Sequence, residues 1–156
     1  MPPLLNERIT SFSVDHNTLE AGLYVSRIDG DITTYDLRFI KPNTPPFLEQ
    51  KALHTIEHLF ATFARNSEFA HNVIYFGPMG CRTGFYLLVR DLSNRDTITL
   101  IMKTLEQAIA FEGEIPGSKQ EECGNYLEHD LEGAKAEMRK YYNVLKNWTI
   151  YNLQYK

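Results

Sequence analysis

The sequence predicts an α+β fold, in which an antiparallel or mixed sheet packs against helices within a single domain. A hairpin pattern lies near the N-terminus, and three later segments repeat apolar residues at helical spacing. Strands and helices do not alternate regularly, as they would in a parallel α/β fold. The 156 residues fit one domain of ordinary size, residues 1–156, and 43% hydrophobic with 23% charged residues is typical of a globular chain.

Residues 22–41 predict a β-hairpin. An Asp29-Gly30 pair between β-prone runs is a strong hairpin signal. Alternating side chains lie on both sides of this turn: Tyr24, Ser26 and Ile28 before it, and Thr33, Tyr35, Leu37 and Phe39 after it. Residues 42–49 contain three prolines and should form a loop.

A helix is expected over about residues 50–66. Its apolar side chains recur at helical spacing: Ala52, Leu53, Ile56, Leu59, Phe60, Phe63 and Ala64. Residues 73–76 and 85–91 read as two short strands, separated by the turn-rich segment GPMGCRTG at 77–84.

Two further helices complete the predicted fold. Ser93 is a suitable N-cap for a helix over about 94–111, whose apolar residues share one face. Residues 113–122 should be mostly loop, with room for a helical turn before Cys123. The last strong helix is expected from Leu131 to Lys146.

Composition argues against two classes of function. The net charge is −4 and no long basic run occurs, which disfavours nucleic-acid binding because that affinity comes mostly from clustered cations. No apolar stretch is long enough to span a membrane. Residues 1–7 lack the pattern of a signal peptide, so we expect a cytoplasmic protein whose two cysteines stay as thiols.

The segment HTIEH, residues 54–58, indicates a metal site. His54 and His58 are four residues apart and lie on one face of a helix, so both imidazoles can bind one cation at about 2.0–2.1 Å. Glu57 is placed to act as a general acid or base beside the metal. H-x-x-E-H is the inverted form of the zincin motif.

Two histidines are too few for a metal site, and the sequence offers several third ligands: Cys81, Cys123, His16, His71 and His129. One cysteine could be a ligand and the other an acid/base. Two other classes fit the motif as well. A metallopeptidase would use Glu57 to activate water, and a structural zinc module would use both cysteines in a closed Cys₂His₂ site.

Five ordered segments are similar to the LuxS family of S-ribosylhomocysteine lyases, and together they run along nearly the whole chain. They are SFSVDHN at 11–17, YDLRFIKPN at 35–43, HTIEHLFATFARN at 54–66, GPMGCRTGFYL at 77–87 and ECGNYLEHDLEGAKAEM at 122–138.

The resemblance implies a LuxS-like fold and a role for each site residue. His54, His58 and Cys123 would hold Fe²⁺, one per subunit, which zinc or cobalt can replace. Cys81 and Glu57 would be the acid/base pair. The substrate-binding residues it implies are Ser11, His16, Arg38 and Arg65. The substrate would be S-ribosylhomocysteine, bound at the interface of a homodimer.

The implied reaction splits a thioether without hydrolysis. The sugar carbonyl moves from C1 to C3, and sulfur then leaves C5 by β-elimination. The products would be homocysteine and 4,5-dihydroxy-2,3-pentanedione, the autoinducer-2 precursor. Where the family usually reads D-x-S, this chain has Tyr75-Phe76-Gly77, so we expect a contact with the substrate's amino group to be lost or remade. Residues 147–156 lie outside these five segments, and the resemblance implies no role for them.

Overall fold

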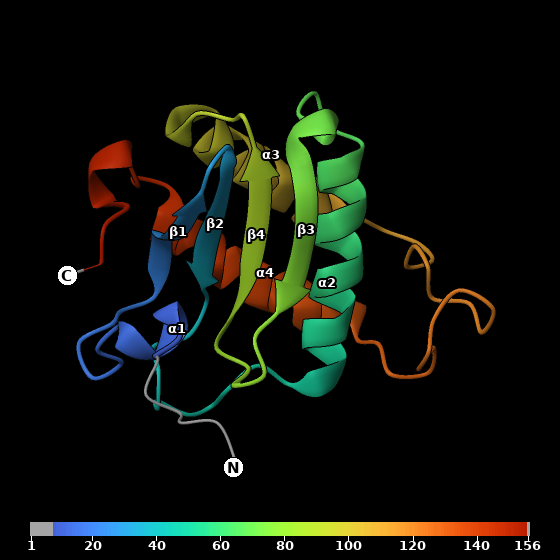
Figure 1. Ribbon diagram of the computed structural model, residues 1–156. Helices are drawn as coiled ribbons and strands as arrows, with labels where there is room; N and C mark the ends of the chain where they lie inside the picture. Colours follow the sequence, from blue (N-terminus) through green and yellow to red (C-terminus); the bar gives the residue numbers. More distant parts are fainter. Residues whose placement is uncertain (1–7, 156) are drawn as a thin grey trace, which may run out of the picture.

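The computed structural model describes residues 8–155 and shows one four-stranded sheet with helices packed on it (Figure 1). The strand order is β1-β2-β4-β3, and every neighbouring pair is antiparallel. The predicted α+β class is therefore confirmed. The N-terminal segment 1–7, whose sequence lacks a signal-peptide pattern, lies outside the described residues, and the domain limits 1–156 stay a prediction.

Strands β1 (Gly22–Asp29) and β2 (Ile32–Arg38) form the predicted hairpin. Asp29 pairs with Ile32, so the connecting loop is Gly30-Asp31, one residue later than expected. Gly30 has a φ of +61°, a conformation that a residue without Cβ adopts at little cost. A bulge between Val25 and Arg27 interrupts the alternation that the sequence suggested for β1.

The central strand of the sheet is formed late in the chain. Strand β4 (Gly84–Arg90) pairs with β2 on one side and with β3 (Val73–Pro78) on the other. The turn between β3 and β4 carries Cys81 at the end of the sheet. Both strands agree with the segments predicted from the sequence, although β3 extends two residues further.

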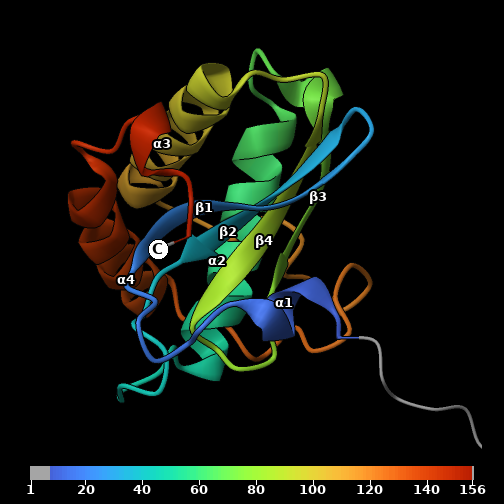
Figure 2. The same ribbon diagram turned by 60° about the vertical axis from the view of Figure 1, so that its left-hand side comes forward.

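Three long helices, α2 (Gln50–Arg65), α3 (Asn94–Ala110) and α4 (Leu131–Leu145), lie on one side of the sheet (Figures 1 and 2). Each ends within one residue of its predicted limit. Ser93 caps α3 as predicted, because its Oγ accepts a hydrogen bond from the Asp96 amide. Three short helical turns were not predicted: α1 (Thr10–Ser13), η1 (Ala70–Asn72) and η2 (Ile150–Asn152).

The core between sheet and helices contains a continuous chain of aromatic rings. Phe60 of α2 stacks on Phe76 of β3 at 4.1 Å between ring centroids, and Phe76 stacks on Phe85 at 4.9 Å. Phe39 then joins Phe85 to Tyr141 of α4. Burying each Phe stabilises the fold by about 1.5–3 kcal/mol, so these packed rings hold α2 and α4 firmly against the sheet.

The opposite face of the sheet is polar near the end of β2. Tyr35 and Leu37 are completely buried among the helices, so Asp36 and Arg38 point to the other face. They are nevertheless buried, because α1 and the C-terminal segment pack around them. Within residues 8–155, every helix is too short or too polar to cross a membrane.

Candidate metal centre and adjoining cavity

Four side chains converge where α2 meets the long segment between α3 and α4. The nitrogens of His54, His58 and His129 and the sulfur of Cys123 all lie within 4.8 Å of one another. His54 and His58 are half-buried on one face of α2, as their spacing predicted. Cys123 and His129 come from a segment with no regular helix or strand over its described length, 111–130.

The segment that carries Cys123 also orients the two helix histidines. Nδ1 of His54 donates to the carbonyl of Glu128 at 2.8 Å, and Nδ1 of His58 donates to the carbonyl of Pro116 at 2.9 Å. Gly117 makes this approach possible: its φ is +69°, and a Cβ there would lie 3.2 Å from His58 Nδ1. Such partners hold the rings of metal-binding histidines in place.

The donor set fits a metal ion that prefers nitrogen and sulfur. Cys123 Sγ lies 3.4 Å from Nε2 of His54 and 4.0 Å from Nε2 of His58. Ordinary Zn–S and Zn–N bonds at a tetrahedral ion place sulfur and nitrogen about 3.6 Å apart. Thiolate and imidazole suit iron, zinc or cobalt and disfavour magnesium and calcium.

His129 lies as close to the cysteine sulfur as His58 does. Its Nε2 is 4.0 Å from Cys123 Sγ, although the resemblance assigned it no role. Burial first, and then the neighbouring His54 and His58, lower the pKa of His129 to about 4. The ring is therefore neutral at physiological pH.

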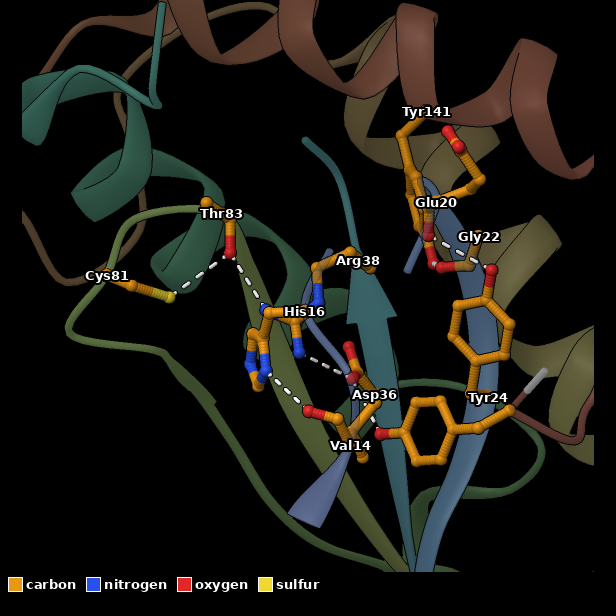
Figure 3. Close-up of polar contacts among 11 residues, drawn as sticks. Val14, His16, Glu20, Gly22, Tyr24, Asp36, Arg38, Cys81, Thr83 and Tyr141 are labelled. Atoms are coloured by element: carbon orange, nitrogen blue, oxygen red, sulfur yellow. Dashed lines mark hydrogen bonds and ion pairs between the residues drawn. The ribbon is translucent and has the colours of Figure 1, made fainter. Parts of the chain in front are cut away.

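A cavity of about 400 Å³ opens on the polar face of the sheet, beside the turn that carries Cys81. Four residues singled out from the sequence line it: Ser11, His16, Arg38 and Cys81. Phe12 and Tyr86 add apolar surface. The structure thus brings together residues that lie up to seventy positions apart in the chain, while His16 is held by a 2.8 Å hydrogen bond between its Nδ1 and the Val14 carbonyl (Figure 3).

A row of hydrogen bonds leads from the buried pair of β2 to Cys81 (Figure 3). Asp36 binds Arg38 at 2.7 Å, and Arg38 Nη1 donates to Thr83 Oγ1 at 2.9 Å. Because arginine can only donate, Thr83 accepts from it and keeps its own proton free. That proton can be donated to Cys81 Sγ, 3.1 Å away.

The buried carboxylate of Asp36 keeps the guanidinium of Arg38 charged. Burial lowers the pKa of Arg38, but the charge and hydrogen bond of Asp36 raise it more, and the net pKa is raised. Tyr155 also donates to Asp36 Oδ2 at 2.7 Å, so the C-terminal segment helps to hold the carboxylate that binds Arg38. Sequence reasoning missed Asp36, Thr83 and Tyr155. Thr83 and Tyr155 contact β2 across 45 and 119 positions, which no local pattern pairs, and the link of Asp36 to the site depends on those contacts.

Two predicted site residues lie in neither group. Glu57 follows His54 by three residues on α2 and is half-buried, but it is not among the cavity-lining residues. Arg65 is exposed at the end of α2 and donates to the carbonyls of Val73 and Ile74 in β3. Their roles stay proposals.

The cavity and the His/Cys cluster share no residue within 8–155. Cys81 is an exposed free thiol in the cavity and Cys123 a half-buried free thiol in the cluster, so the expectation that both stay as thiols is confirmed. A closed metal site containing both cysteines does not match this arrangement.

The sequence difference at 75–77 also has a local counterpart, because the ring of Tyr75 lies where a side chain at Gly77 would be.

Fold and site together define an α+β protein with a candidate mononuclear His/Cys metal centre and a separate thiol-bearing cavity. The family model described as S-Ribosylhomocysteinase (LuxS) matches residues 9–151. The chain belongs to this family.

Three curated relatives, each named S-ribosylhomocysteine lyase, are similar over nearly their full length. The protein of Borreliella afzelii is 46% identical over 155 residues, covering 96% of this chain and 99% of its own. That of Phocaeicola vulgatus is 49% identical over 154 residues, with 94% and 96% covered. That of Finegoldia magna is 48% identical over 153 residues, with 95% and 97% covered.

Proposed function

We propose that this chain is a metal-dependent S-ribosylhomocysteine lyase. It converts S-ribosylhomocysteine to homocysteine and 4,5-dihydroxy-2,3-pentanedione, the precursor of autoinducer-2. The observation that carries the proposal is the convergence of His54, His58 and Cys123 in a chain so similar to proteins named for this activity.

The reaction consists of proton transfers next to a carbonyl, followed by loss of sulfur. Moving a proton from C2 to C1, and then from C3 to C2, carries the carbonyl from C1 to C3. Removal of the C4 proton then lets the C5–S bond break, and the bonding electrons leave with sulfur, which takes up a proton. The enol left across C4 and C5 then moves its hydroxyl proton to C5, which gives the diketone. The atoms of the substrate are divided between the two products, and no water is consumed.

His54, His58 and Cys123 are the proposed ligands of one Fe²⁺ per chain, with zinc or cobalt able to replace it. When bound, the metal would supply Lewis acidity toward the sugar oxygens, which makes the neighbouring carbon–hydrogen bonds more acidic. The fixed Nδ1 contacts of the two histidines support this assignment, because they leave both Nε2 lone pairs directed at Cys123.

Cys81 and Glu57 are the proposed acid/base pair. The contact with Thr83, itself bound to charged Arg38, fixes the Cys81 sulfur on the cavity wall, which supports Cys81 as the group that exchanges a proton with carbon. Glu57 follows the ligand His54 by one helical turn, so its carboxylate belongs to the same end of α2.

We assign the cavity to the sugar and amino-acid parts of the substrate. Ser11, His16 and Arg38 offer a hydroxyl, an imidazole and a guanidinium on its wall, which suits polyol and carboxylate groups. Arg65 is the fourth proposed binding residue. Its guanidinium already donates to β3, so binding substrate would require it to share or change these partners.

A homodimer would unite the cavity with the metal centre. The two groups have no residue in common within the described chain, and the three long helices all lie on the other side of the sheet from the cavity (Figure 2). We therefore propose a cytoplasmic homodimer in which facing subunits complete each active site. Light scattering of active protein that gave a mass near the 18.1 kDa monomer would contradict this.

Anaerobically purified, iron-loaded protein incubated with S-ribosylhomocysteine tests the function. We expect one free thiol for each substrate consumed, together with the diketone product. Protein that holds one metal per chain but releases no thiol would overturn the proposal.

A further inference from the structure

Three imidazoles surround Cys123, but their protons are not placed alike. His54 and His58 each direct Nδ1 at a backbone carbonyl, which can only accept. Both rings must carry their proton on Nδ1. Their Nε2 atoms therefore present a lone pair, as a metal ligand requires.

His129 directs Nδ1 at a hydroxyl instead. Thr55 Oγ1 lies 2.9 Å from His129 Nδ1 and accepts a 2.9 Å hydrogen bond from the Asp130 amide. Thr55 is completely buried, and these two are its hydroxyl's hydrogen-bond partners within residues 8–155. The hydroxyl proton is satisfied only if it is donated to His129 Nδ1. His129 then carries its own proton on Nε2.

The ring orientations agree with this assignment. His129 stacks on His54 with 4.0 Å between centroids and only 21° between ring planes. A nitrogen lone pair lies in the plane of its ring, so two nearly parallel stacked rings cannot both direct lone pairs at one ion. His54 and His58, by contrast, are perpendicular at 90°, which allows their lone pairs to converge.

We propose that His129 is a positioning residue whose Nε2–H donates a hydrogen bond to the Cys123 thiolate, and that it is not a fourth metal ligand. The proposal rests on the proposed metal site. The Nε2 atom of His129 lies 4.0 Å from Cys123 Sγ. Hydrogen bonds to a coordinating sulfur withdraw charge from it and tune the metal. His129 thus offsets the loss of Lewis acidity that a thiolate ligand brings, and leaves one coordination position for substrate.

Cobalt(II)-loaded protein gives a readout that does not depend on turnover. A thiolate bound to cobalt produces a sulfur-to-metal charge-transfer band, and a hydrogen bond to sulfur moves that band to higher energy. His129→Ala should keep one cobalt per chain and shift the band to longer wavelength. His129→Gln, which retains an N–H donor, should restore the band toward the wild-type position.

Thr55 supplies a matched second pair of variants. Thr55→Val keeps the shape of the side chain but cannot donate to Nδ1, so the His129 proton is no longer confined to Nε2 and the band should shift part of the way. Thr55→Ser keeps the hydroxyl and should leave the band unchanged. This pair also serves if His129→Ala fails to fold.

The outcomes separate this inference from the proposed function. Loss of cobalt from His129→Ala would make His129 a ligand, and an unmoved band in His129→Ala and Thr55→Val would mean that no hydrogen bond reaches sulfur. Either result overturns the inference while the wild-type metal site stands. Wild-type protein without a thiolate charge-transfer band would overturn the metal site itself.

Discussion

The metal cluster and the cavity are built on opposite principles. The charged wall of the cavity is fixed by a regular strand: Arg38 lines the cavity from β2 and is bonded to Asp36, two residues earlier on the same strand, and both are buried. In the cluster only His54 and His58 belong to a helix, while Cys123 and His129 arrive on a segment without regular structure. One group is held by the sheet itself, and the other depends on hydrogen bonds between the histidines of α2 and the segment that carries Cys123.

This difference teaches where each region should be sensitive. In the cluster, removing one donor removes part of what holds the segment to α2, so binding and local order should be lost together. In the cavity, the framework persists without Cys81, because the strands on either side are paired along their length. The four predictions that follow test this contrast, from the largest expected effect to the smallest.

Metal binding should be abolished by His54→Ala, His58→Ala or Cys123→Ala, because three protein ligands leave no redundancy. Metal analysis of each purified variant tests this. His71→Ala is the control, since His71 is exposed and outside the cluster, and it should retain one metal per chain. Near-stoichiometric metal in the Cys123 variant would remove that residue from the ligand set.

Cys81→Ala should keep its metal and its fold but lose thiol release by about 10²–10⁴-fold, the usual contribution of a positioned acid/base. Cys81→Asp should recover part of the activity, because a carboxylate can take the same proton at a similar reach. The test compares metal content with activity on the same samples. A metal-free Cys81→Ala protein would refute the division into two regions.

Asp36→Ala should lower the free energy of unfolding by about 3–5 kcal/mol, because it leaves the buried charge of Arg38 without its partner. Urea denaturation measures this. Asp29→Ala is a matched control on the neighbouring strand: it breaks the Arg27–Asp29 pair, which is about half exposed, and should change stability little. Equal effects would mean that the cavity framework does not depend on the buried pair.

Thr83→Val should slow alkylation of Cys81 by iodoacetamide at neutral pH by about 10-fold, because it removes a hydrogen bond to the reacting sulfur. The factor corresponds to the free energy of one hydrogen bond to a charged group. Thr83→Ser keeps the hydroxyl and should react like the wild type, and metal content should stay the same in both. The alkylation measurement uses Cys123→Ala backgrounds for each, so that only one thiol reacts, and metal content is measured on the Thr83 variants that keep Cys123. Equal rates in the Val and Ser variants would remove Thr83 from the support of Cys81.

The contrast also explains how far the sequence alone could reach. Helix α2 was predictable to within a residue, and with it the pairing of His54 and His58, because helical spacing is a local property. The hairpin was predictable too, apart from the bulge in β1 and a one-residue shift of its turn. Cys123 and Cys81 received their roles from the family resemblance, since no spacing rule connects them to α2.

What stayed hidden were contacts between distant segments. Thr55 reads in the sequence as an ordinary core residue of a helix, and only the structure shows its hydroxyl against His129, 74 positions later. Tyr155 lies in the tail 147–156, which matched none of the five segments although the family model extends to residue 151, and it binds Asp36 across 119 positions. Such pairs depend on how the chain returns on itself, which local propensity does not encode.

The carbonyls of Pro116 and Glu128 orient the two helix histidines, and this affects which positions of the site are conserved in sequence. Every amino acid has a carbonyl, so natural selection can preserve the contact to His54 while the side chain at position 128 drifts. A saturation mutagenesis map would score Glu128 as tolerant although its backbone is indispensable. Selection here acts on the position of the backbone and not on the side chain, so an alignment of related sequences would show little conservation at residue 128.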